Sequence, residues 1–341
     1  MNPIQKCLEM AVDRKGQEIL LNSLQPIRLR VGKDLLPITD GQISANEIRQ
    51  MLSQILTEDE KKSLYENFKL QGVKKIGDVS FKFDFQIDFD GVNGSMVLQN
   101  ENAQLWAFPA MASESVLRAQ GLNLIVGPRR SGKTAAVQSL LAASQGRKKI
   151  IAIFSDEENL NFASDGNVLS HYPSQQLKSG AIPQSADLII IDSPETIFCE
   201  KALRLAEEGR SVLLTLPFWN LKMGLQRMLD LCEGSEQSRA RRLGGTLQMG
   251  LGLRLLPGIE APLQGAFELL FADSEVLNAL TKQNFESIPD LMRSSAEKSG
   301  MRSLNQTLFQ LLMKRKIEMK TAFEASPLPE ELDSLLKKVG I

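Results

Sequence analysis

The sequence is poor in histidine, cysteine and tyrosine, and it has no long apolar run. Its 341 residues include 1 His, 3 Cys and 2 Tyr. Cys7, Cys199 and Cys232 are widely spaced and odd in number, a pattern that fits neither a disulfide framework nor a metal cluster. No segment approaches the roughly 18 apolar residues of a membrane helix, and charged residues interrupt residues 1–21, where a signal peptide would be apolar. We therefore expect a cytoplasmic protein without direct membrane insertion.

The sequence also lacks an excess of charge of either sign. Lys and Arg total 40 against 41 Asp and Glu, for a formal net charge of -1. This balance gives no global attraction toward nucleic acid or an anionic membrane surface, so neither is expected as a partner. The chain is long enough for two domains with cores of their own.

Residues 18–100 show mixed helix and strand patterns. Alternation predicts a strand at 26–31, followed by a turn, and a longer strand at 79–89 with one buried face. Ser44 with Glu47, followed by apolar residues at helical spacing, predicts a helical segment over 44–68. We interpret residues 1–105 as a small α+β domain.

The pattern changes after residue 100. Short, nearly continuous apolar runs separated by helical segments predict a parallel sheet that is covered on both faces. These runs are 122–126, 150–154, 188–191 and 212–216. From Trp219 onward helices dominate, with one more strand expected at 266–271. The second domain is expected over 114–341.

The segment 127–134, Gly-Pro-Arg-Arg-Ser-Gly-Lys-Thr, fits the P-loop pattern G-x-x-x-x-G-K-[ST]. It follows a predicted strand and opens a predicted helix, which is the context this motif requires. Gly127, Ser131 and Gly132 are then expected to surround phosphates with backbone N–H groups. Lys133 would reach the β- and γ-phosphates of ATP, and the Thr134 hydroxyl would ligate Mg²⁺. Arg129 and Arg130 either add charge toward the phosphates or point into solvent.

Asp192 ends the apolar run 188–191, as the acidic residue of a Walker B strand does, and we expect it to hold Mg²⁺. A group that activates water is harder to find. Glu157 and Glu158, with Asp192, are the weak candidates. His171 is interpreted as a surface loop residue. Three arginines are interpreted as an exposed helix face: Arg239, Arg241 and Arg242. The alternative is that they contact a phosphate in a neighbouring subunit.

These motifs, together with 206–209, 254–257 and 300–306, resemble the type IV pilus retraction ATPases (PilT-like) of the secretion ATPase superfamily. The resemblance covers nearly the whole chain. It implies a PAS-like N-terminal domain and a RecA-like core with C-terminal helices. It also implies a homo-oligomeric ring such as a hexamer, or a mixed ring with a paralogous motor. The partner it implies is an inner-membrane platform protein of a pilus or secretion system.

The sequence departs from that family where hydrolysis is catalysed. Without a gap, the Glu-Asp pair after the second strand aligns with Phe154 and Ser155, and a shift of one residue recovers only the second acid, as Asp156. The two family histidines align with Arg210 and Pro217, although Thr215 is kept. The first domain of that family normally reaches the nucleotide with arginines on its strands, but no arginine occurs here between Arg49 and Arg118. The departures predict a divergent paralogue that binds ATP with weak or no hydrolysis.

Two other functions remain open. One is an active motor with Glu157 or Glu158 as its base and Arg210 as a sensor. The other is an interaction protein with a vestigial P-loop. A small-molecule kinase is disfavoured, because it leaves the first domain and the C-terminal helices without a role.

Overall fold

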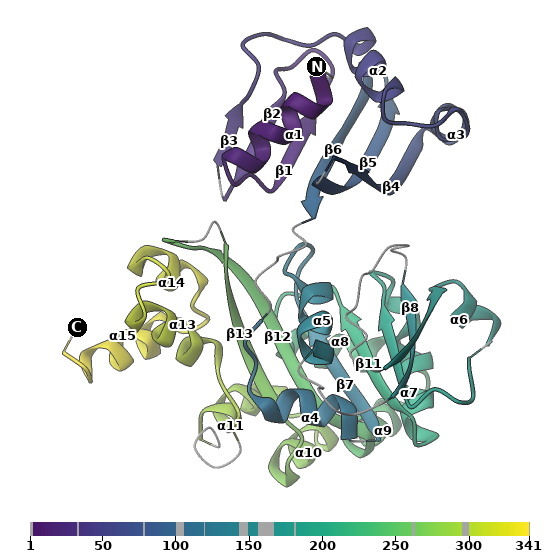
Figure 1. Ribbon diagram of the computed structural model, residues 1–341. Helices are drawn as coiled ribbons and strands as arrows, with labels where there is room; N and C mark the ends of the chain where they lie inside the picture. Colours follow the sequence, from purple (N-terminus) through teal and green to yellow (C-terminus); the bar gives the residue numbers. More distant parts are fainter. Residues whose placement is uncertain are drawn as a thin grey trace. The chain divides into compact units, whose positions relative to one another are not determined.

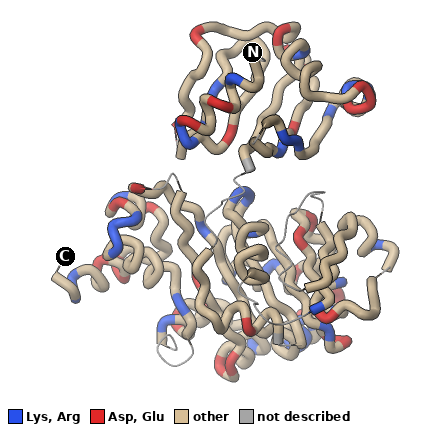
Figure 2. Tube along the Cα trace, in the orientation of Figure 1, with Lys and Arg blue, Asp and Glu red and all other residues tan. Residues whose placement is uncertain are grey.

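A computed structural model describes most of the chain, in two compact units (Figure 1). The described residues are 3–32, 34–77, 79–99, 106–118, 120–142, 149–155, 167–180, 182–260, 263–294 and 300–340. The first unit comprises Met1–Gln104 with Glu260–Leu263, and the second comprises Leu105–Ile259 with Gln264–Ile341. In the described part of the chain, no helix is long and apolar enough to cross a membrane. Acidic and basic residues are interspersed over both units (Figure 2).

The first unit is an antiparallel sheet with helices packed against it. The sheet order is β3-β2-β1-β6-β5-β4. Its strands are β1 (Glu18–Leu21), β2 (Arg28–Val31), β3 (Asp34–Pro37), β4 (Lys69–Ile76), β5 (Val79–Asp88) and β6 (Gly91–Gln99). Its helices are α1 (Pro3–Asp13), α2 (Ala45–Ser53) and α3 (Glu58–Asn67). The alternation seen in the sequence places Phe81, Phe83 and Phe85 of β5 in the core of this unit.

The helical segment expected over 44–68 is two helices, so the prediction of one continuous segment is wrong. α2 ends at Ser53, and Thr57 caps a new helix by accepting from the backbone N–H of Glu60, whose side chain accepts from Thr57 in return. Because such a reciprocal cap satisfies two N–H groups, it stabilises a second helix start.

The second unit contains a sheet in the order β13-β12-β7-β11-β10-β8-β9. All neighbouring pairs from β12 to β9 are parallel. Its strands are β7 (Gly121–Val126), β8 (Ile150–Ser155), β9 (Val168–Pro173), β10 (Leu188–Asp192), β11 (Ser211–Leu216), β12 (Leu247–Pro257) and β13 (Leu263–Phe271). The four apolar runs became β7, β8, β10 and β11, whose residues are almost all buried.

Helices cover both faces of this sheet, as the sequence predicted (Figure 1). α4 (Ala110–Arg118) and α5 (Lys133–Ala142) pack on one face, and α7 (Cys199–Glu207), α8 (Leu221–Leu231) and α9 (Glu236–Thr246) on the other. The remaining helices are α6 (Gln176–Ser179), η1 (Thr196–Phe198), α10 (Ser274–Thr281), η2 (Phe285–Ser287), α11 (Ile288–Ser294), α13 (Leu304–Met313), α14 (Met319–Ala325) and α15 (Pro329–Lys337). The last three share a small core with β12 and β13.

In the second unit, two strands were not predicted from the sequence. β12 contains Gly250 and Gly252, which weaken a strand signal, but in the fold a Cβ at either glycine would collide with Leu221 or Glu268. β9 is a polar edge strand and includes His171, which was expected in a loop. Partial burial lowers the pKa of His171.

Candidate functional site

The P-loop connects the buried strand β7 to helix α5, which begins at Lys133. Its two glycines are required by the loop geometry. A Cβ at Gly127 would lie 2.2 Å from Ser131 Oγ, and Gly132 has a φ of +83°. Arg130 also has a positive φ, 64°, which is unusual for a residue with a side chain. The loop therefore closes tightly at the amino end of α5, and the side chains of Arg129 and Arg130 are exposed.

The Lys133 ammonium lies across the loop. Nζ donates to the carbonyl of Gly127 at 2.9 Å and to that of Pro128 at 3.0 Å. Burial lowers the pKa of Lys133, the Asp192 carboxylate opposes this effect, and the nearby Arg129 lowers the pKa further. A cation is thus held at the loop by carbonyl oxygens, which are weaker partners than a phosphate would be.

Asp192 lies between two threonine hydroxyls at the carboxyl end of β10. Thr134 Oγ1 donates to Oδ2 at 2.7 Å, and Thr215 Oγ1 donates to Oδ1 at 2.8 Å. The parallel pairing of β10 with β11 brings the two strand ends together, and the P-loop brings the first turn of α5 to them. Thr134 and Asp192, both predicted, are therefore in contact. Thr215, which lies in a predicted strand, was not expected to orient the carboxylate.

Ser131 is the second polar group buried in the loop. Its side chain is only 3% exposed, and its Oγ has no hydrogen-bond partner among the described residues. A buried hydroxyl without a partner is costly, at about 1–3 kcal/mol. The Ser131 hydroxyl and the Lys133 ammonium can therefore each form a further hydrogen bond inside the loop.

Glu157 and Glu158 were considered as the base for hydrolysis, and Arg210 as a sensor. Glu157 and Glu158 lie outside the described residues. Arg210 lies at the amino end of β11, where its guanidinium donates to the carbonyls of Gln184 and Ala186. Since β11 spans 6 residues, Arg210 is about 20 Å from the carboxyl edge at ~3.3 Å per residue. The geometry therefore does not favour Arg210 as a sensor for the P-loop.

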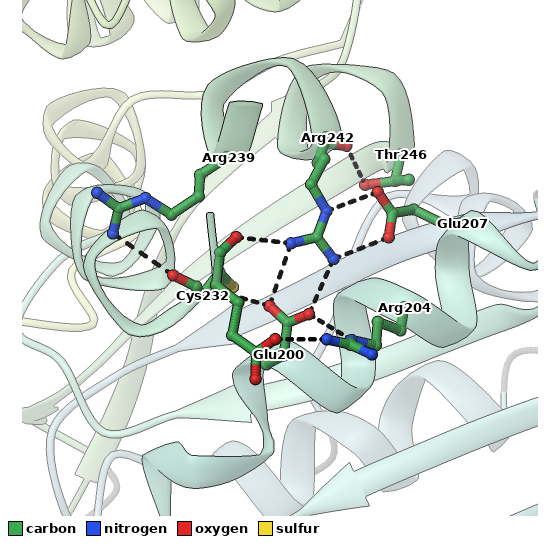
Figure 3. Close-up of polar contacts among 8 residues, drawn as sticks. Glu200, Arg204, Glu207, Cys232, Arg239, Arg242 and Thr246 are labelled. Carbon is green, nitrogen blue, oxygen red and sulfur yellow. Dashed lines mark hydrogen bonds and ion pairs between the residues drawn. The ribbon is translucent and has the colours of Figure 1, made fainter. Parts of the chain in front are cut away.

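The interpretation of the α9 arginines as an exposed face is wrong for Arg239 and Arg242. Arg242 binds Glu200 and Glu207 of α7, and Arg204 also binds Glu200 (Figure 3). Arg239 donates to the carbonyl of Leu229 at 2.8 Å. These bonds tie α9 to α7 and to the end of α8 because the helices pack side by side. Arg241 remains exposed.

A half-buried carboxylate near the P-loop was not expected from the sequence. Glu268 of β13 accepts from the backbone N–H of Leu221 at 2.7 Å, beside Gly252 of β12. Burial raises the pKa of Glu268, while the Leu221 amide and the Arg254 cation oppose this rise. Arg254 lies 3.6 Å from the centroid of the Trp219 ring. The only available signal was Glu268's position within the predicted strand 266–271.

Known proteins share this architecture along its whole length. No family model matches the chain. A crystal structure of the pilus retraction motor PilT with bound ADP superposes with a TM-score of 0.74 at 22% identity, over 97% of this chain and 99% of that one. That likeness confirms the expected fold class, a PAS-like α+β domain followed by a RecA-like core with C-terminal helices.

Two curated relatives are similar in sequence. The type IV pilus ATPase PilU of Pseudomonas aeruginosa is 20% identical over an alignment of 355 positions, which covers 98% of this chain and 91% of PilU. The chain is thus similar, over nearly its whole length, to PilT-like type II/IV secretion ATPases. A twitching motility protein of Neisseria gonorrhoeae is 21% identical, with 83% of this chain and 80% of that protein aligned. The P-loop, Asp192 and Thr215 are therefore the candidate site.

Proposed function

We propose that this PilT-like protein binds ATP with Mg²⁺ at the P-loop, hydrolyses it slowly or not at all, and acts as a subunit or regulator beside a pilus or secretion motor. The observation that carries the proposal is the contact between Thr134 and Asp192 at 2.7 Å. It joins the last residue of the P-loop motif to the acid that ends β10.

The phosphate-binding groups are all in the loop. Lys133 would exchange its bonds with the Gly127 and Pro128 carbonyls for charge-assisted bonds to phosphate, which are roughly twice as strong as neutral ones. The unused Ser131 hydroxyl and the N–H groups at the start of α5 add donors.

The residues present also fit a magnesium ion. Mg²⁺ prefers oxygen ligands, and Thr134 Oγ1 and the Asp192 carboxylate supply a hydroxyl and a charge at one point. The ion, when bound, would neutralise phosphate charge. Thr215 would keep the carboxylate oriented through its own hydrogen bond.

Slow hydrolysis is supported by the side chains at the carboxyl edge of the sheet. Ser155 pairs with Asp192 in the register of β8 and β10, and Pro217 follows β11 directly. The Ser155 hydroxyl is too weak a base to take a proton from water at pH 7, and the Pro217 side chain has neither a donor nor an acceptor. General base catalysis contributes about 10²–10⁴-fold, and a lost charge-stabilising donor costs about 10²–10³-fold.

The wider role is proposed from the relatives. PilU is named a type IV pilus ATPase, and PilT a pilus retraction motor. By analogy, the protein would act in the cytoplasm within a homo-oligomeric or mixed ring. There it would contact an inner-membrane platform protein of a pilus or secretion machine.

Calorimetric titration with Mg-ATP tests the site. Wild type should bind, and Lys133→Ala should bind at least about tenfold more weakly because it loses a charge-assisted bond. Lys201→Ala, on α7, is the matched control and should bind as wild type does. Absence of binding by folded wild type would overturn the proposal. Turnover equal to that of an active pilus motor would overturn the slow-hydrolysis part alone.

A further inference from the structure

Trp106 packs directly against the P-loop. A Cβ on Gly132 would lie 3.2 Å from its Cζ2 and 3.3 Å from its Nε1. On its other edge, a Cβ on Gly265 of β13 would lie 2.5 Å from its Cζ3. The indole therefore fits between two residues that have no side chain, one of which is the second glycine of the P-loop motif.

Further contacts hold the ring in place. Trp106 stacks on Phe108 with centroids 5.6 Å apart and planes 8° apart, and Phe108 meets the edge of Phe267 at 5.2 Å. The backbone N–H of Trp106 donates to Ser139 Oγ on α5 at 2.8 Å. An aromatic ring fixed by its neighbours loses little conformational entropy when it binds a ligand.

The ring is not completely covered, because Trp106 is only partly buried. A nucleotide whose phosphates lie at the amino end of α5 must place its ribose and base beside the loop. An indole fixed against Gly132 offers an apolar surface there, and stacking on such a ring accepts any base because every base has a π face.

We propose that Trp106 is the base-stacking residue of the nucleotide site. The inference rests on the proposed ATP site and adds how the base is held. Stacking without hydrogen bonds to the base edge predicts weak discrimination between ATP and GTP. It predicts a clear preference for either nucleotide over tripolyphosphate, which has no base.

Titrations of Mg-ATP and Mg-tripolyphosphate into wild type, Trp106→Ala and Trp106→Phe test the assignment. Loss of a stacking partner should weaken ATP binding by about tenfold or more. Tripolyphosphate binding should not change, and Trp106→Phe should retain most of the ATP affinity. Thermal melts of the three proteins check that each is folded.

The alternative is that Trp106 only supports the P-loop. In that case Trp106→Ala would weaken ATP and tripolyphosphate binding by the same factor, which would overturn the assignment. Unchanged ATP affinity in Trp106→Ala would also overturn it. Absence of ATP binding by wild type would instead remove the proposed nucleotide site itself, so the two failures are distinguishable.

Fluorescence gives an independent readout, because the chain has 2 Trp. In a Trp219→Phe background, Trp106 is the sole tryptophan, and an aromatic ring is kept beneath Arg254. Mg-ATP should change the emission of this variant, and Mg-tripolyphosphate should change it much less. Equal changes with both ligands would contradict base stacking.

Discussion

Thr134 donates its hydroxyl to Asp192 at 2.7 Å, across 58 positions of sequence. The bond connects the first turn of α5 to the carboxyl end of β10. Thr215 donates to the other carboxylate oxygen at 2.8 Å, so Asp192 is held from two sides. A carboxylate oriented in this way needs little rearrangement to face a cation at the P-loop.

Asp192→Asn should make nucleotide binding nearly independent of magnesium. The amide is similar in size but carries no charge, and changes of this kind near a metal typically cost about 10- to 100-fold in metal affinity. ATP affinity measured with magnesium and with EDTA checks this. Asp187→Asn is the control, since Asp187 accepts from Ile150 N just before β10 begins, at the opposite edge of the sheet. A variant with the magnesium dependence of wild type would contradict the assignment of Asp192.

Arg130→Gly should stabilise the fold. A φ of 64° costs an L-residue about 1–2 kcal/mol, whereas glycine adopts it freely. The greater freedom of glycine in the unfolded chain offsets about 0.5–1 kcal/mol of this gain. The free energy of unfolding, measured in denaturant, should therefore rise by about 0.5–1 kcal/mol. Arg129→Gly, at a position without a positive φ, should lower it; equal losses in both variants would argue against strain at Arg130.

Glu200→Gln should destabilise the protein at neutral pH and less so in acid. Burial alone would raise the pKa of Glu200, but hydrogen bonds from Arg242 and Arg204 outweigh it and lower the pKa to about 2. The stabilisation is therefore present above the ordinary pKa of 4.5 and is lost as the pH falls toward 2. The Glu200 side chain is 14% exposed, so we expect a loss of about 1–3 kcal/mol at pH 7.

Denaturant unfolding between pH 7 and pH 3 measures this effect. The gap between Glu200→Gln and wild type should narrow as the pH falls. Glu208→Gln, an exposed residue at the end of the same helix, is the control and should follow wild type throughout. A constant gap would mean that charge is not the reason for the loss.

At higher pH, Glu268→Gln should be more stable than wild type. Burial raises the pKa of Glu268 above 4.5. The folded state holds the Glu268 proton more tightly than the unfolded state does. Protonation of Glu268 therefore stabilises the fold fully below about pH 4.5, and this stabilisation is lost as the pH rises through the folded-state pKa. Glutamine can still accept from Leu221 N but cannot ionise. Relative to wild type, the variant should therefore gain stability as the pH rises above 4.5. Parallel pH profiles would contradict this, and Glu275→Gln, at an exposed position of α10, controls for the substitution.

Local patterns in the sequence were enough to predict the strands that matter for the site. β7, β10 and β11 are apolar along their length because both of their faces are covered, and that is visible without a structure. The P-loop is likewise a local motif, whose glycines are dictated by its own backbone. Thr134 was predicted as a magnesium ligand from that motif, and Asp192 was predicted as one because it ends an apolar run.

Contacts between distant segments were decided by the tertiary fold. β12 forms despite two glycines because Leu221 and Glu268 occupy the space where their side chains would lie. Glu268, Thr215 and Trp106 are unremarkable in sequence, since their environments are made by α8, β10 and the P-loop. Arg239 and Arg242 of α9 were expected on an exposed helix face. They bind carboxylates and carbonyls because α7 and α8 lie beside α9. Burial and partner choice depend on which elements meet in space, and one chain's local pattern does not contain that information.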